Sequence, residues 1–243
     1  MSALVDLLTE TAPPWASITS TDGTKLRVAA APPKLSGAPG DRFELFIETF
    51  AFEATVSEVD RGTRLPLACP ERHINGDGSF CLGFRQAAIT SRDNAQAFWS
   101  TLRGYLLAQQ FAERHGRWPP GRWLSHGSEA AASQIAAERS AVICGLNSEY
   151  AAALNYGIGW LAGILPEVFE AECCDHALPA RPSRSNKLGL VKGCASCDAL
   201  AELLQHEQAR RSADAFFVQM ARSERPCCET MPRCPLRADS ANL

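Results

Sequence analysis

The chain lacks any long uninterrupted apolar run. Its longest apolar stretch, Tyr150–Leu165, contains Asn155 and three glycines and is shorter than the ~20 residues that a membrane span needs. A strong charge of either sign is also missing, because 24 Lys and Arg face 27 Asp and Glu for a formal net charge of -3. This balance gives no electrostatic basis for nucleic acid or an anionic membrane as a primary partner. We therefore expect neither.

Targeting and repeat signals are missing as well. The first residues include Asp6 and Glu10 and do not form the basic and apolar segment of a secretory signal. No internal repeat or low-complexity tract is visible. A chain of 243 residues with 46% hydrophobic and 21% charged residues is typical of a soluble globular protein with one large domain or two ordinary ones. The predicted location is the cytoplasm.

Cysteine, in contrast, is abundant and clustered. Seven of the ten cysteines lie between Cys173 and Cys234. A reducing compartment disfavours a disulfide framework, so the cluster indicates metal binding. The pair Cys194-Ala-Ser-Cys197 has the spacing with which two thiolates hold one tetrahedral ion, although redox-active thiols share it. The candidate ligands are Cys173, Cys174, Cys194, Cys197, Cys227, Cys228 and Cys234, with His176 nearby.

The preferred interpretation of this cluster is structural zinc, as one or two ions. We expect Cys194 and Cys197 to bind it together with one residue from the Cys173/Cys174 pair and one from Cys227, Cys228 and Cys234. An iron–sulfur cluster, a redox-active dithiol and ordinary buried thiols remain alternatives. The isolated residues Cys69 and Cys144 are expected to be packed in the interior, and His115 and His126 are assigned no function.

Two halves of the chain differ in pattern. Before residue 127, period-2 alternation predicts strands, and a helix begins at Ser91 and ends near Gly116. After residue 128 alanine-rich helices follow. This predicts two domains, 1–127 and 128–243. The predicted strands are Lys25–Ala30, Arg42–Phe52, Phe52–Val59 and Leu65–Ala68; the later helices are Ala130–Leu146, Ser148 to about Leu165, and Cys197–Arg222 with Leu200, Leu203, Leu204, Phe216, Phe217 and Met220 as its buried stripe.

The segment HINGDGSFCL, residues 73–82, carries the most specific functional pattern. It places the thiol of Cys81 six residues after the amide of Asn75, across a turn rich in glycine, Asn and Asp. Such a turn brings a polar amide close to a nucleophile without steric penalty. A thiol nucleophile with an amide as oxyanion donor indicates acyl transfer through a thioester. The alternative is that Cys81 is buried and behaves as a small hydrophobic residue without a catalytic role.

The same segment resembles the active-site signature of ubiquitin-conjugating (E2) enzymes. His73, Asn75, Gly78, Phe80, Cys81 and Leu82 match the family's His-Pro-Asn, loop, Gly-x-hydrophobic-Cys-Leu pattern. Ile74 replaces the proline and the loop is shorter, a form similar to bacterial E2-like proteins of ubiquitin-like conjugation operons. An E2-like half joined to a cysteine-rich extension also resembles the bacterial E2 domain-associated cysteine-rich proteins. The resemblance implies an α+β fold: an E2-like (UBC-like) antiparallel β-meander packed on helices, followed by a mainly helical, cysteine-rich, metal-binding domain.

The resemblance also implies a mechanism and partners. An E1-like adenylating enzyme would pass a ubiquitin-like modifier to Cys81 as a thioester, and an acceptor nucleophile, typically a lysine, would then take it. Asn75 would stabilise the oxyanion and His73 would organise the loop. Asp77 is either a carboxylate that orients the incoming amine or a solvated turn residue. Operons of this type often imply bacterial defence against phage.

Two other functions are kept open. One is a zinc-stabilised adaptor that binds the E1-like enzyme or the modifier and catalyses nothing; the presence of both Cys81 and Asn75 argues against it. The other is a thiol redox protein that uses Cys194 and Cys197, which metal content would distinguish.

Overall fold

The computed structural model describes residues 3–34, 36–83, 88–119, 125–159, 161–162, 195–224, 226–232, 234 and 236–237. The chain divides into two compact units. The first contains Met1–Pro119 together with Glu224–Leu243, and the second contains Pro120–Ser223. The C-terminal segment thus groups with the first unit, whereas the sequence analysis places it with the second half of the chain.

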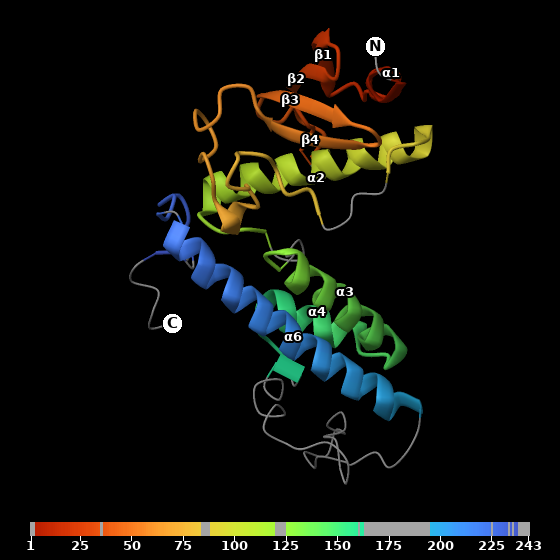
Figure 1. Cartoon of the computed structure of the whole chain (residues 1–243), viewed down its shortest axis with the longest axis vertical. Coiled ribbons are helices and arrows are strands. Elements are labelled where there is room, and N and C mark those ends of the chain that lie inside the picture. Colours follow the sequence, from red (N-terminus) through yellow and green to blue (C-terminus); the bar gives the residue numbers. More distant parts are fainter. Residues whose placement is uncertain are drawn as a thin grey trace. The chain divides into compact units, whose positions relative to one another are not determined.

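The first unit is built on a four-stranded antiparallel sheet. Its strands are β1 (Ala16–Asp22), β2 (Lys25–Ala30), β3 (Phe43–Phe50) and β4 (Glu53–Glu58), in the order β1-β2-β3-β4. Each strand pairs with the next one along the chain, as expected for a meander (Figure 1).

Alternation along the strands gives the sheet one buried face. In β3, Phe43, Leu45 and Ile47 are buried, and the residues between them are more exposed. Side chains alternate between the two faces of a strand, so these residues lie on one side. The long helix α2 (Arg92–His115) runs along the sheet (Figure 1). The core of the unit therefore lies between this face and α2.

Local signals fix the ends of α2. Ser91 accepts a hydrogen bond from the backbone of Asn94, which caps the N-terminus. Gly116 follows the last helical residue with φ of 61°, a left-handed conformation that favours glycine. The short helix α1 (Ala3–Glu10) is held beside α2, since the indole of Trp99 donates to the carbonyl of Leu8 at 3.2 Å.

The second unit consists of helices in its described part: α3 (Ser128–Ile143), α4 (Asn147–Tyr156) and α6 (Ala195–Glu224), which extends to the first residue of the C-terminal segment. Its apolar core comprises Ala137, Ala141, Leu146, Tyr150, Leu161, Leu203 and Leu204. Cys144 packs against this cluster, which confirms its predicted place in the interior.

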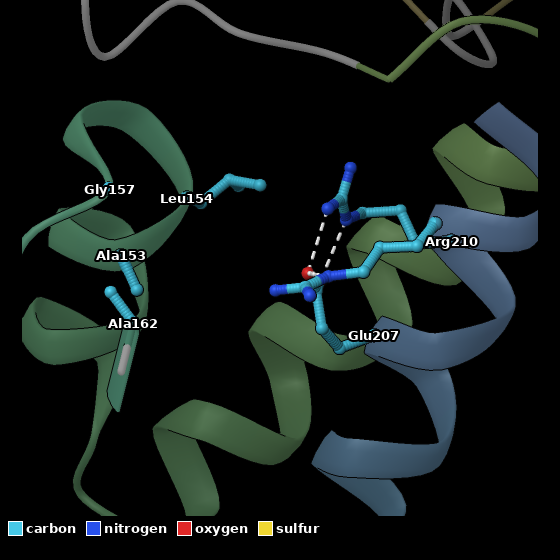
Figure 2. Close-up of a pocket in the computed structure, with 7 residues that line it drawn as sticks. Ala153, Leu154, Gly157, Ala162, Glu207 and Arg210 are labelled. Carbon is cyan, nitrogen blue, oxygen red and sulfur yellow. Dashed lines mark hydrogen bonds and ion pairs between the residues drawn. The ribbon is translucent and has the colours of Figure 1, made fainter. Parts of the chain in front are cut away.

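A buried charge network joins α4 to α6. The carboxylate of Glu207 accepts two hydrogen bonds from Arg210, at 2.6 and 2.7 Å, and one from the hydroxyl of Tyr150 at 2.7 Å. Arg211 donates a further bond at 2.7 Å. Figure 2 shows Glu207 and Arg210 across a cavity of about 160 Å³ from Leu154. Buried charges are stable only when paired in this way.

Most predicted elements are present, and three details are wrong. Leu65–Ala68 is not a strand; the amide of Leu65 donates instead to the buried carboxylate of Glu58 at 3.1 Å. The helix predicted to reach Leu165 ends at Tyr156, because Gly157 adopts φ of 63°. In α6, Leu203 and Leu204 are buried as predicted, but Phe216 and Met220 are 62% and 45% exposed. None of the described helices is long and apolar enough to cross a membrane.

Candidate active site

A tight hairpin brings His73 and Cys81 opposite one another. The backbone amide of Cys81 donates to the carbonyl of His73 at 2.8 Å. Two residues further in, the amide of Asn75 donates to the carbonyl of Ser79 at 2.8 Å, and Gly78 closes the turn by donating to Asn75 at 3.0 Å. The six-residue spacing between Asn75 and Cys81 in the sequence thus corresponds to a single hairpin.

The hairpin is anchored on both the sheet and α2. The amide of Phe80 donates to the carbonyl of Val56 in β4 at 2.7 Å. The buried ring of Phe80 stacks on that of Tyr105 in α2, with centroids 4.7 Å apart. The hydroxyl of Tyr105 in turn donates to the carbonyl of His73 at 3.0 Å. These contacts fix the backbone on either side of Cys81.

His73 itself is held inside the unit. It follows the short 3-10 helix η1 (Pro70–Arg72) with φ of 52°, a left-handed conformation that is uncommon for residues other than glycine. Its side chain is buried, and its ring lies 5.0 Å from that of Trp118. This placement suits a residue that organises the loop, and that role remains a prediction.

Arg72 and Gln109 form a buried pair next to the hairpin. The sequence analysis did not predict this pair. Gln109 donates to the carbonyl of Arg72 at 2.7 Å and accepts from its guanidinium at 2.8 Å. Both side chains are buried. Within the described residues, the Nη2 atom of Arg72 has no hydrogen-bond partner. The position of Gln109 in the apolar stripe of α2 was the available signal, because a polar residue there needs a buried partner.

Cys81 is half-buried, and burial raises the pKa of its thiol, partly offset by a hydrogen bond with the backbone of Gly83. A thiol with a raised pKa is protonated at neutral pH, whereas the thiolate is the nucleophile. If Cys81 reacts as a nucleophile, its thiol must first lose this proton or lose it during the reaction.

The polar residues of the turn bond to one another. The amide of Asn75 donates to the hydroxyl of Ser79 at 3.0 Å. The carboxylate of Asp77 accepts from the same hydroxyl at 2.6 Å and from the Ser79 amide at 2.9 Å, and these bonds lower its pKa. Asp77 thus has the contacts of a turn residue. Among the described residues, no hydrogen bond joins the Asn75 amide to the Cys81 thiol.

The first unit was compared with models of known protein families. Residues 15–120 match the family model described as Prokaryotic E2 domain. The chain carries an E2-like domain of the prokaryotic type. No curated protein and no solved structure matches the chain.

The E2-like domain includes the whole sheet, η1, the hairpin and α2. It implies a role in conjugation and, in general terms, E1-like and ubiquitin-like partners. The match covers less than half of the chain and does not extend to α3, α4 or α6. The match therefore gives no information about the helical unit.

Replacing Gly78 by alanine should destabilise the hairpin of the E2-like domain. Gly78 has φ of +82°, and an added Cβ would lie 2.8 Å from Cδ of Arg61, which packs over the turn. Strained positive φ costs about 1–3 kcal/mol. We expect urea denaturation to show a loss of that size, and none for alanine at the exposed Gly76. Equal stability of the two variants would show that the backbone conformation of Gly78 does not require glycine.

The predicted metal ligands are only partly within the described residues. Cys173, Cys174 and Cys194 lie outside them, as does the side chain of Cys197. Cys227, Cys228 and Cys234 are described, and all three belong to the segment that groups with the first unit. In the described part of the chain, no group of three or more His, Cys, Asp and Glu side chains is positioned to hold a metal ion as it stands.

The two histidines that were assigned no function have structural contacts. His126 is buried, and its Nδ1 atom lies 3.1 Å from a carboxylate oxygen of Asp214. The ring of His115, at the end of α2, lies 4.3 Å from that of Phe111.

Proposed function

We propose that the E2-like domain is a conjugating enzyme. Cys81 accepts a ubiquitin-like modifier from an E1-like enzyme as a thioester and transfers it to an acceptor amine, typically of a lysine. The observation that carries the proposal is a half-buried Cys81 on an anchored hairpin inside a prokaryotic E2 domain.

The first step is an exchange of thioesters. The sulfur of Cys81 attacks the carbonyl carbon of the modifier, a new C–S bond forms, and the C–S bond to the cysteine of the E1-like enzyme breaks. The proton of the Cys81 thiol passes to the departing thiolate. In the second step the acceptor nitrogen attacks the same carbon, a C–N bond forms and the C–S bond to Cys81 breaks. A proton of the acceptor amine then passes to the departing Cys81 thiolate.

Asn75 is the proposed oxyanion donor in both steps. An amide nitrogen carries two protons, and the bond to Ser79 uses one of them. The second proton is the one that would point to the oxyanion. The tight turn from Asn75 to Gly78 holds the amide on the same hairpin as the thiol, so little reorganisation is needed as charge develops.

A charging assay tests the proposal. The full chain is mixed with the E1-like enzyme, the modifier and ATP, and the products are run on gels with and without reductant. We expect an adduct that reductant removes and that Cys81→Ala abolishes. Cys144→Ala, which replaces a half-buried cysteine of the helical core, should leave it unchanged. No adduct with an E1-like enzyme shown to be active would instead support the non-catalytic adaptor.

A further inference from the structure

Cys69 lies against the C-terminal segment. Its sulfur is 3.0 Å from that of Cys228, and a hydrogen bond joins the two thiols across 159 residues of sequence. Cys234 interacts with both of these sulfurs and with the side chain of Cys227. Cys69 and Cys234 are fully buried, whereas Cys227 and Cys228 are half-buried. Four thiols therefore meet at one place in the first unit, which we call the thiol cluster.

The local backbone shapes this cluster. The amide of Glu229 donates to the sulfur of Cys227 at 3.3 Å, and Glu229 has φ of 60°. The hydroxyl of Thr230 lies 3.2 Å from the sulfur of Cys228. Hydrogen bonds to sulfur stabilise the thiolate form, the form that binds metals. The turn is thus held in a strained conformation that places the Glu229 amide as a donor to the sulfur of Cys227.

The sulfurs of Cys69 and Cys228 are closer together than two ligands of one zinc ion. Two thiolates that bind one tetrahedral zinc, each about 2.3 Å from the ion, lie roughly 3.8 Å apart. The separation of 3.0 Å between these two sulfurs would therefore have to widen by less than one ångström.

We propose that Cys69, Cys227, Cys228 and Cys234 bind one zinc ion that fastens the C-terminal segment to the E2-like domain. Four thiolates form a closed, structural site with no position open for catalysis. The set differs from the sequence-based one in two ways. It includes Cys69, which comes from the E2-like domain itself, and it leaves out Cys173, Cys174, Cys194 and Cys197. The inference does not depend on the proposed transfer of a modifier.

The site would stabilise the base of the active-site hairpin. The amide of Cys69 donates to the carbonyl of Ile74 at 3.0 Å, and the amide of Ile74 donates back to Cys69 at 2.9 Å. Ile74 lies between His73 and Asn75. A zinc ion on Cys69 therefore holds the backbone that positions both proposed active-site residues.

Metal content of the full chain tests the proposal. Protein purified under reducing conditions is analysed by elemental mass spectrometry, and Cys69→Ser and Cys228→Ser are compared with Cys144→Ser. We expect each of the first two to contain one zinc per chain less than the wild type, and Cys144→Ser to lose none. This difference is informative even if cysteines elsewhere in the chain bind a second ion. Unchanged zinc in both cluster variants would overturn the proposal.

A second measurement uses the wild-type protein, so it tests the proposal even if the cysteine variants do not fold. The wild type is treated with N-ethylmaleimide with and without a zinc chelator, and labelled cysteines are identified by peptide mass spectrometry. We expect Cys227 and Cys228 to react at least tenfold faster after zinc removal, while Cys144 keeps its rate. Equal rates with and without the chelator would contradict metal binding.

Discussion

Alanine in place of Asn75 is expected to slow transfer of the modifier from Cys81 to an acceptor amine by about 10²–10³, the usual cost of one lost oxyanion donor. Binding of the E1-like enzyme should be unaffected, because the change removes a donor and leaves the surrounding surface in place. The measurement is a single-turnover discharge of the preformed thioester against a lysine-containing acceptor.

Ser79→Ala is the matched control for this prediction. It removes the same hydrogen bond between Asn75 and Ser79 and leaves the amide in place. If the amide acts on the oxyanion, Ser79→Ala discharges close to the wild-type rate, and only Asn75→Ala is slow. If the amide only holds the turn together, both variants are slowed equally, and the proposed role of Asn75 is wrong.

Glu207→Gln should destabilise the helical unit by about 3–5 kcal/mol, the cost of removing one partner from a buried ion pair. Glu207 is 2% exposed and accepts bonds from Arg210, Arg211 and Tyr150. Glutamine keeps the shape of the side chain and removes its charge, so the buried guanidinium of Arg210 loses its counterion. Urea denaturation followed by far-UV circular dichroism measures the loss.

Glu202→Gln on the same helix is the control. Its carboxylate lies on the surface and accepts one long bond from Ser140, at 3.4 Å. A surface change of this kind costs less than about 0.5 kcal/mol. Faster hydrogen exchange in α3, α4 and α6 should appear only in Glu207→Gln. Equal stability of the two variants would show that the network around Glu207 contributes nothing.

The contribution of Glu207 should also depend on pH. Burial alone would raise the pKa of this carboxyl, but hydrogen bonds and charge from Arg210 hold it below the ordinary value of 4.5. A depressed pKa gives stability that is fully present above pH 4.5 and is lost as the pH falls through the lower, folded-state pKa. The difference in stability between the wild type and Glu207→Gln should therefore shrink on acidification.

Much of the E2-like domain could be predicted from sequence because its signals are local. Alternating residues identified β2, β3 and β4, and Ser91 and Gly116 marked the ends of α2. The strand β1 was missed because its sequence, ASITSTD, has a single buried side chain, Ala16, and so little alternation. The false strand at Leu65–Ala68 had apolar residues and lacked a neighbouring strand to pair with.

In the candidate site, too, the features formed by a short segment could be predicted, and the contacts between residues far apart in the sequence could not. The hairpin from His73 to Cys81 follows from glycine, Asn and Asp in a short segment, and the structure forms it as a hairpin. The supports from Tyr105 and the contact of Cys69 with Cys228 depend on residues far apart in the sequence. The general tendency of cysteine to be buried correctly predicted that Cys69 lies in the interior. Spacing rules compare close neighbours, so they grouped Cys228 with other late cysteines and not with Cys69.

The return of Glu224–Leu243 to the first unit makes that unit discontinuous in the chain. The helical unit, Pro120–Ser223, is then an insertion between two parts of one folded body. Cutting the chain after residue 127 would remove Cys228 and Cys234 from their contacts with Cys69. A shortened protein that is meant to keep these contacts therefore has to include the C-terminal segment together with the E2-like domain.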